Sequence, residues 1–211
     1  MMDAQNNCAG IIRPDTDENT DWPEFQKRTL NIPPRRMLVK ALEYFGSFSG
    51  YAVDLGCGSG VDTIKLAESG WRVYAVDSTP DGFDNIRANL PESMQDNVEC
   101  VSISFEDMAI PDADLIYSSF SIPFCKPEAF EDFWEKIVNA IKPGGRFSGN
   151  LFGEKDEWVY MQDVTFVTKT RIDELFKDFE IEYFREQYSE GPAVLSPTKL
   201  WHLFEIVAKK K

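Results

Sequence analysis

The stretch Val53-Asp54-Leu55-Gly56-Cys57-Gly58-Ser59-Gly60 decides the fold, because a short apolar run ends there and a helical pattern begins. Glycine tolerates positive φ and lets a ligand approach the backbone without a Cβ atom in the way. The helix that follows presents free N–H groups in its first turn. The stretch therefore predicts a strand, a tight turn and a helix that together form a cradle of the nucleotide-binding kind.

The spacing of these glycines separates two classes of ligand. A dinucleotide fingerprint requires the pattern Gly-x-Gly-x-x-Gly, but here Gly60 comes one residue early and Val61 occupies the expected place. Asp54 lies two residues before the first glycine. A carboxylate there would repel a pyrophosphate and attract a cation that carries an amine and a sulfonium. We therefore expect a cationic ligand; the alternative is that Asp54 only satisfies the turn.

A second carboxylate belongs to the same pattern. Asp77 ends the apolar run that begins at Val73, 21 residues after Gly56. An acid at the tip of the second strand, about 20 residues beyond the glycine turn, is placed to accept hydrogen bonds from both hydroxyls of a ribose. The turn and its two carboxylates together predict a site for a positively charged nucleoside.

The rest of the chain shows an α/β pattern. Short apolar runs alternate with helical stretches from Tyr51 to about residue 152, which predicts parallel strands with helices on both faces of the sheet. Two strand-like runs, 179–190 and 198–210, are too close together for a helix between them, so we expect an antiparallel hairpin. One domain is expected over residues 22–211, preceded by a flexible polar arm over residues 1–21.

Two further motifs join the glycine turn and Asp77. Phe105-Glu106-Asp107 follows the third expected strand, and Lys142-Pro143-Gly144-Gly145 precedes the fifth. With these motifs the chain resembles a class I S-adenosylmethionine-dependent methyltransferase over residues 33–211. The resemblance implies a doubly wound, Rossmann-like sheet of seven strands in the order 3-2-1-4-5-7-6, with strand 7 antiparallel. The stretches 119–124 and 150–158 are loosely similar to small bacterial methyltransferases of the tellurite-resistance type.

The resemblance also implies S-adenosylmethionine as the cofactor and assigns residues to it. The motif glycines would contact the methionine part, Asp77 the ribose, and Glu106 and Asp107 the adenine. The expected cofactor site comprises Asp54, Gly56, Cys57, Gly58, Gly60, Asp77, Ser78, Glu106, Asp107 and Ser119.

Methyl transfer from a sulfonium is an in-line displacement with a good leaving group, so positioning matters more than a protein nucleophile. Ligands of open α/β sheets bind beyond the carboxyl ends of the strands. We therefore place the acceptor near Phe124, Trp158 and Trp201, with Trp22 as a cover. The only histidine, His202, begins the last strand at the same edge and is a candidate general base; the alternative is a sheet histidine that is bonded locally.

Composition excludes several classes of protein. With 43% hydrophobic and 27% charged residues the chain is neither collagen-like nor wholly disordered. A net charge of −14 disfavours nucleic acid and anionic membranes as partners. No apolar run approaches the roughly 20 residues of a membrane span, and the first 20 residues lack the features of a secretory signal, so we expect a cytoplasmic protein. The four cysteines form no Cys-x-x-Cys pair, and we expect no metal.

We therefore predict methyl transfer from S-adenosylmethionine to a small-molecule acceptor. Nothing added to the core resembles a docking domain for protein or nucleic acid. The alternative is a non-catalytic regulatory module that binds S-adenosylmethionine. An NAD-dependent oxidoreductase is disfavoured by Val61, by Asp54 and by the lack of a Tyr-x-x-x-Lys pair. The sequence does not distinguish among acceptors or oligomeric states.

Overall fold

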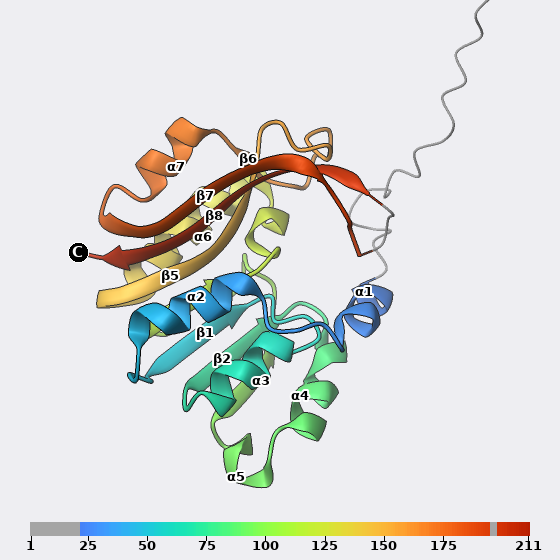
Figure 1. Cartoon of the computed structure of the whole chain (residues 1–211), viewed down its shortest axis with the longest axis vertical. Helices are drawn as coiled ribbons and strands as arrows, with labels where there is room; N and C mark the ends of the chain where they lie inside the picture. The colour runs from blue at the N-terminus through green and yellow to red at the C-terminus, as the bar shows by residue number, and fades with distance from the viewer. Residues whose placement is uncertain (1–21, 195–197) are drawn as a thin grey trace, which may run out of the picture.

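A twisted sheet runs through the part of the chain that the computed structural model describes, residues 22–194 and 198–211 (Figure 1). Its strands lie in the order β3-β2-β1-β4-β5-β8-β7, and the short β6 also pairs with β5. The strands are β1 Tyr51–Leu55, β2 Arg72–Asp77, β3 Val98–Ser102, β4 Ala113–Ser118, β5 Ile141–Gly153, β6 Phe166–Val167, β7 Phe179–Gly191 and β8 Lys199–Lys210. The five strands from β1 to β5 pair in parallel, whereas β8 is antiparallel to both β5 and β7.

This topology confirms the predicted fold class, strand order and C-terminal hairpin, with β7 and β8 as the sixth and seventh strands of the expected order. The two-residue β6 was not predicted. It pairs with Phe152 and Gly153 at the end of β5, beyond the last residue that β4 reaches. The expected arm over residues 1–21 lies outside the described residues.

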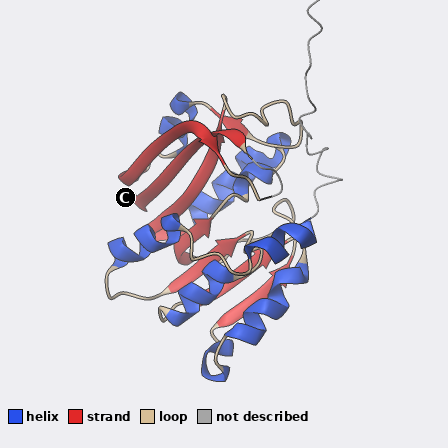
Figure 2. Ribbon diagram, turned by 45° about the vertical axis from the view of Figure 1, so that its right-hand side comes forward, coloured by secondary structure: helices blue, strands red, loops and turns tan. Residues whose placement is uncertain are grey.

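Helices cover both faces of the sheet (Figure 2). They are α1 Trp22–Thr29, α2 Arg36–Phe45, α3 Val61–Glu68, α4 Phe83–Asn89, α5 Glu92–Gln95, α6 Pro127–Ala140 and α7 Lys169–Leu175. Apolar residues of α2, α3 and α4 pack in one core cluster, and those of α6 and α7 pack in another across the sheet. The central strands of the sheet are therefore buried on both faces, as their near-continuous apolar sequences require, whereas the edge strand β7 is largely exposed.

The leading helix α2 shows how the local sequence fixes an element. Met37, Leu38 and Ala41 recur at helical spacing and are buried against the sheet. The helix ends at Gly46, where φ is +62° and the glycine N–H donates to the carbonyl oxygens of Leu42 and Glu43. The apolar spacing and the glycine at the C-terminal end thus account for this helix.

The Lys142-Pro143-Gly144-Gly145 motif lies inside β5 and not before it, which corrects the prediction. Ala113 of β4 pairs with Ile141, but Leu115 pairs with Arg146, so the four motif residues bulge out of the register. Gly144 has φ of +78°, which glycine adopts without a steric penalty. The motif therefore acts as an irregularity in a long strand.

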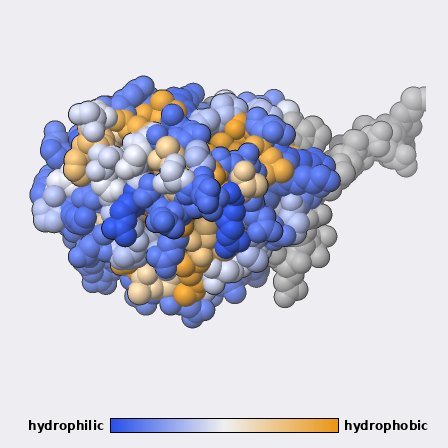
Figure 3. Space-filling view, turned by 90° about the horizontal axis from the view of Figure 1, so that it is seen from below, coloured by the Kyte–Doolittle hydropathy of each residue, from blue (hydrophilic) through white to orange (hydrophobic). Residues whose placement is uncertain are grey.

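The face of the protein that Figure 3 shows is largely hydrophilic. On the face seen in Figure 3, hydrophobic residues occur in separate patches among hydrophilic ones. None of the described helices is both long enough and apolar enough to span a membrane.

Candidate active site

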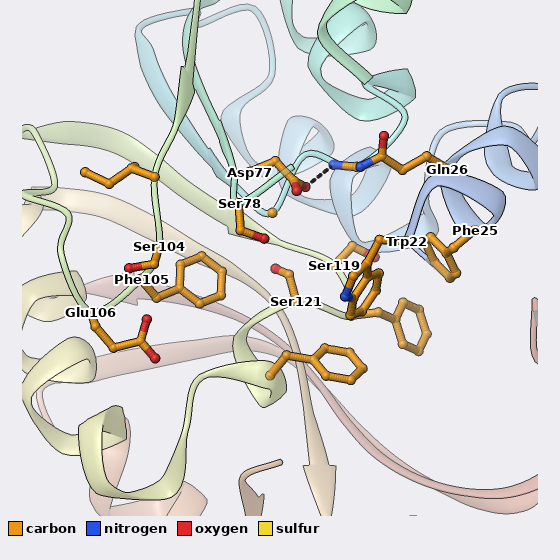
Figure 4. A pocket seen from close by; sticks show the side chains of 15 residues that line it. Trp22, Phe25, Gln26, Asp77, Ser78, Ser104, Phe105, Glu106, Ser119 and Ser121 are labelled. Atoms are coloured by element: carbon orange, nitrogen blue, oxygen red, sulfur yellow. Dashed lines mark hydrogen bonds between the residues drawn. The ribbon is translucent and has the colours of Figure 1, made fainter. Parts of the chain in front are cut away.

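A cavity of about 250 Å³ opens where the carboxyl ends of β1, β2, β3 and β4 meet. Its lining comprises Trp22, Phe25 and Gln26 of α1, Gly56 and Gly58 after β1, Asp77 and Ser78 at the end of β2, residues 103–106 after β3, and residues 119–121 with Phe124 after β4. Phe105 and Glu106 lie at one end of the view in Figure 4, and Trp22 and Phe25 lie at the other. The structure thus brings together eight of the predicted site residues: Trp22, Gly56, Gly58, Asp77, Ser78, Glu106, Ser119 and Phe124.

The three glycines of the turn meet different structural requirements. All have positive φ, +72° at Gly56, +53° at Gly58 and +80° at Gly60. A Cβ atom at Gly56 would collide with Ser121, and one at Gly60 would collide with Ile86. A Cβ atom at Gly58 would meet nothing within 4 Å. Gly56 and Gly60 therefore permit close packing, whereas Gly58 leaves its backbone open to a ligand. Gly60, which was predicted in the cofactor site, lines neither cavity.

The Asp77 carboxylate is fixed at the cavity by backbone donors from two turns. Its Oδ2 accepts the N–H of Gly58 at 2.8 Å (Figure 4). Its Oδ1 accepts the N–H of Thr79 at 2.9 Å and the Thr79 hydroxyl at 3.0 Å. The two predicted halves of the site, the glycine turn and the acid of the second strand, are thus joined directly.

A second cavity of about 50 Å³ adjoins the first and is lined by two acids, the buried Asp54 and the partly buried Asp62. Asp54 accepts the Thr63 hydroxyl at 2.6 Å, and Asp62 accepts the Tyr117 hydroxyl at 2.7 Å and the Arg35 N–H at 2.8 Å. Burial, and then the proximity of Asp62, raises the pKa of Asp54 to about 8. A cation placed here would be attracted to this pair and would lower that pKa. Cys57, predicted in the cofactor site, also lines this cavity.

Phe120 separates the two cavities and lines both of them. With φ of +57° it is the only described residue other than glycine in the left-handed region. Its N–H donates to the buried Asn150 side chain at 2.7 Å, and the next residue, Ser121, donates its hydroxyl to the carbonyl oxygen of Leu55. Strained backbone of this kind persists where surrounding contacts impose it, and it clusters at functional sites.

Of the four aromatic residues predicted to contact the acceptor, two line the cavity and two lie behind it. Trp22 packs edge-on against Phe124, with ring centroids 5.2 Å apart. Trp158 packs against Phe124 at 6.4 Å, and Trp201 packs against Phe120 at 5.5 Å. Trp158 and Trp201 line neither cavity. They therefore form a second layer that supports the aromatic wall.

A buried ion pair holds this second layer in place. The Lys199 ammonium pairs with the Asp156 carboxylate, and both side chains are almost completely buried. The same ammonium lies 3.7 Å from the ring centroid of Trp158 and 4.0 Å from that of Trp201. Burial lowers the pKa of Lys199, which the hydrogen bond to Asp156 opposes. Sequence reasoning missed this pair, because its two members are 43 residues apart.

His202 is not placed to act as a base in either cavity, which corrects the prediction. It is 2% exposed, its Nδ1 accepts the Lys155 N–H at 3.0 Å, and its Nε2 lies 3.0 Å from Glu186 Oε1. Successive residues of a strand point to opposite faces, so Trp201 faces the aromatic layer while His202 faces away from it. The environment of His202 is that of the alternative interpretation, a histidine in the sheet that is hydrogen-bonded locally.

Other differences concern residues near the cavity ends. Asp107 lines neither cavity and accepts the Ser104 hydroxyl at 2.9 Å. Phe25 and Gln26 line the first cavity without having been predicted, because α1 is only eight residues long and its apolar positions form no extended period. One signal in the sequence could have indicated this helix. Glu24 and Arg28 have the i, i+4 spacing of an ion pair on a helix surface.

Residues 52–145 match a family model described as a methyltransferase domain. This range runs from β1 into β5 and contains the glycine turn, Asp77 and the loop after β4. The match covers less than half of the chain, and over these residues the chain is similar to methyltransferase domains.

Known proteins resemble the chain in sequence and in fold. The carboxy-S-adenosyl-L-methionine synthase of Erwinia tasmaniensis is 28% identical over 114 residues, which cover 52% of this chain and 46% of the synthase. The chain therefore spans about half the length of this curated relative. TehB from Haemophilus influenzae superposes with a TM-score of 0.74 at 16% identity, over 89% of this chain and 66% of TehB.

A third protein was solved with ligands. The 1,6-didemethyltoxoflavin-N1-methyltransferase of Burkholderia thailandensis, with bound 1,6-didemethyltoxoflavin and S-adenosylhomocysteine, superposes with a TM-score of 0.63 at 19% identity. The superposition covers 92% of this chain and 81% of that enzyme. At these identities the two solved structures show that the chain has the same fold as theirs.

Proposed function

We propose that this protein transfers a methyl group from S-adenosylmethionine to a small-molecule acceptor. The observation that carries the proposal is the direct bond between the two predicted parts of the site, from the N–H of the open Gly58 to the carboxylate of Asp77, at the edge of one cavity. A turn that leaves its backbone open beside a fixed carboxylate suits a ribose next to an extended, polar chain.

The polar groups of the two cavities fit the parts of this cofactor. Asp77 would accept a ribose hydroxyl, and Glu106 lies at the end of the cavity suited to the adenine. Asp54 and Asp62 in the second cavity would attract the positively charged amine. When bound, S-adenosylmethionine supplies a methyl group on a sulfonium, which leaves readily. The donor set therefore matches a cation that carries a nucleoside, as the glycine spacing predicts.

The chain's own contribution to transfer would be to orient the acceptor and exclude water. Trp22, Phe120 and Phe124 form an aromatic wall at the end of the cavity away from Glu106. Because α1 covers this end, a small acceptor fits better than a macromolecule. The hydroxyl of Ser121 is engaged by a backbone carbonyl. The described residues at this end thus favour an acceptor whose nucleophile needs no general base. The rate of methyl transfer would then depend on the alignment of the acceptor with the methyl group.

Calorimetric titration of the protein with S-adenosylmethionine, S-adenosylhomocysteine and NADH tests the cofactor. We expect the first two to bind and NADH not to bind. Asp77→Ala should weaken S-adenosylhomocysteine binding at least about tenfold, because a ribose hydroxyl loses a charged acceptor. Asp84→Ala, an exposed carboxylate on α4, serves as the control and should bind normally. Equal affinity in Asp77→Ala and the parent would contradict this placement of the ribose.

Turnover distinguishes an enzyme from the non-catalytic alternative. Incubation with S-adenosylmethionine and a panel of small amines, thiols and heteroaromatic compounds should release S-adenosylhomocysteine and add one methyl group to an acceptor, both followed by mass spectrometry. Tight cofactor binding without any acceptor-dependent product across broad panels would favour the regulatory module.

A further inference from the structure

The end of the larger cavity that faces away from Glu106 carries no charged side chain among the described residues. Its lining consists of four aromatic rings and two hydroxyls: Trp22, Phe25, Ser119, Phe120, Ser121 and Phe124. The charged residues that the structure places in the lining, Asp77 and Glu106, belong to the part proposed to hold the nucleoside (Figure 4). One cation, Arg35, lies 5.6 Å from the centroid of the Phe120 ring, but it lines only the second cavity. A buried charge without a partner is strongly unfavourable, so this end favours an uncharged acceptor.

The aromatic rings of this end meet nearly at right angles. Trp22 lies edge-on to Phe124, with an angle of 89° between the ring planes, and edge-on to Phe25, with an angle of 74°. Phe124 in turn packs edge-on against the buried Phe152, with ring centroids 5.9 Å apart. Aromatic rings prefer to pack offset-stacked or edge to face. A flat ring placed in this corner can therefore stack on one ring and meet the edge of its neighbour, which a puckered, saturated ring cannot do.

No described side chain at this end is placed to remove a proton from the acceptor. The two hydroxyls there belong to Ser119 and Ser121, and a serine hydroxyl reacts only when an adjacent base activates it. The Ser121 hydroxyl donates to the carbonyl oxygen of Leu55. A hydroxyl has a single proton, so in the contact of 2.6 Å between Ser118 and Ser121 the donor is Ser118. The Asp77 carboxylate is already held by three hydrogen bonds. The nucleophile must therefore have a free lone pair when it enters the site.

Ionisation separates the classes of nucleophile. At about pH 7 an aliphatic amine, with a pKa of about 10.4, is protonated and has no lone pair, and a phenol, with a pKa of about 10, keeps its proton. A thiol, with a pKa of about 8.5, must become a thiolate, and an apolar environment opposes this by raising the pKa. A ring nitrogen such as that of imidazole, with a pKa of about 6.5, is largely neutral and keeps its lone pair. Of these four classes, the ring nitrogen fits an uncharged site without a base.

We propose that the acceptor is a flat, uncharged heteroaromatic compound whose nucleophile is a ring nitrogen, and that it stacks in the aromatic wall of Trp22, Phe120 and Phe124. The inference deepens the proposed function and rests on it, since it requires methyl transfer in this cavity. The ring nitrogen gives its lone pair to the methyl carbon, the electron pair of the carbon–sulfur bond stays on sulfur, and the positive charge passes to the ring. The faces of the wall rings then stabilise that charge. Where the ring also carries an N–H, this proton is lost to water after the product leaves.

Calorimetry on the protein saturated with S-adenosylhomocysteine tests the acceptor class with three probes. They are benzimidazole, which is flat and neutral, its carboxylate derivative, which is flat and anionic, and cyclohexylmethylamine, which is saturated and cationic. We expect benzimidazole to bind at least about tenfold more tightly than either of the others. Phe124→Leu removes a ring face and keeps an apolar side chain, so it should bind benzimidazole about two- to tenfold more weakly and S-adenosylhomocysteine as the parent does. Phe48→Leu is the matched control and should behave like the parent with both ligands, because Phe48 is exposed and lines neither cavity.

Several outcomes would overturn the inference. They are tighter binding of the anionic or the cationic probe, binding of none of the three, and either equal benzimidazole affinity of Phe124→Leu and the parent or an equal loss with both ligands. The comparison of probes uses the parent alone, so it decides even if the variant does not fold.

The turnover panel gives a second readout. Methylated products should come from its heteroaromatic members, and products from aliphatic amines or thiols instead would also overturn the inference. If the parent does not bind S-adenosylhomocysteine, or binds it and methylates no acceptor, it is the proposed function that fails. The two failures are therefore distinguishable.

Discussion

Asp54→Asn isolates the charge of the acid that precedes the glycine turn. Asp54 is 1% exposed, and burial together with nearby Asp62 raises its pKa to about 8. Asparagine has nearly the same shape, and its side-chain oxygen can accept the same hydrogen bond from Thr63 that the carboxylate accepts at 2.6 Å. The substitution therefore removes the titrating carboxyl, and with it the negative charge that Asp54 acquires as the pH rises through about 8, and it changes little else.

The sign of the effect follows from proton linkage. The folded protein holds the Asp54 proton more tightly than the unfolded chain, where the pKa is near 3.8. The stability that this proton contributes is therefore fully present below about pH 4 and is lost as the pH rises through about 8. Between pH 5.5 and pH 8 the loss amounts to about 3 kcal/mol, at about 1.4 kcal/mol for each pH unit. Asparagine does not titrate, so the variant keeps this stability.

Urea denaturation of the parent and Asp54→Asn at pH 5.5 and pH 8 measures this difference. We expect the variant to be the more stable protein at pH 8, and its advantage to widen by about 3 kcal/mol between the two pH values. Asp84→Asn, whose side chain is 94% exposed, should show no such widening. An advantage for Asp54→Asn that is the same at both pH values would refute the reasoning.

The same variant should lose affinity for the cofactor. If Asp54 attracts the positively charged amine, Asp54→Asn binds S-adenosylhomocysteine more weakly while it gains stability. Opposite changes in stability and binding are typical of a residue that is retained for function. Unchanged binding would favour the alternative in which Asp54 only satisfies the turn.

Three further substitutions separate packing from function. Gly60→Ala should destabilise the protein by about 2 kcal/mol or more, because the new Cβ atom would collide with Ile86. Gly58→Ala should lower the stability by only about 1 kcal/mol, and it should weaken the binding of S-adenosylhomocysteine. Equal thermal stability of the two variants would contradict this distinction between packing and binding. Lys199→Met should cost about 3–5 kcal/mol in urea denaturation because it leaves the Asp156 carboxylate buried and unpaired, and adding Asp156→Asn should restore part of the loss. His202→Gln should lower stability and leave cofactor affinity and turnover per folded molecule unchanged; a hundredfold loss of turnover would restore its role as a base.

Much of the fold could be predicted because its signals are local. The glycine turn, the apolar runs of β1 to β4 and the stop of α2 at Gly46 each depend on a few adjacent residues, and the short connection before β8 requires a hairpin. The motif at residues 142–145 was misplaced for the opposite reason. The same Pro-Gly-Gly residues suit a turn or a bulge, and only the pairing of β4 with β5 chooses between them.

In the candidate site, too, some features have local signals in the sequence and others depend on contacts between distant segments. Gly58 and Asp77 were identified because each follows a strand at a spacing typical of nucleoside sites, and the structure joins them through one hydrogen bond. The sequence left two roles open for His202, a general base or a locally bonded histidine, because it predicts the edge of the sheet at which the residue lies but not the face to which the side chain points. The direction of a strand side chain depends on register, and a shift of one residue reverses it.

The sequence by itself thus determined the α/β topology and the resemblance to methyltransferases, and it predicted a nucleoside site, since these depend on residue type and on spacing along the chain. Only the tertiary structure decided which polar groups are satisfied. Gln26 donates to Thr79, 53 residues further along the chain, and its side-chain oxygen is left as the one buried side-chain nitrogen or oxygen without a partner among the described residues. Hydrogen bonds and burial depend on contacts between distant segments, and no local pattern encodes them.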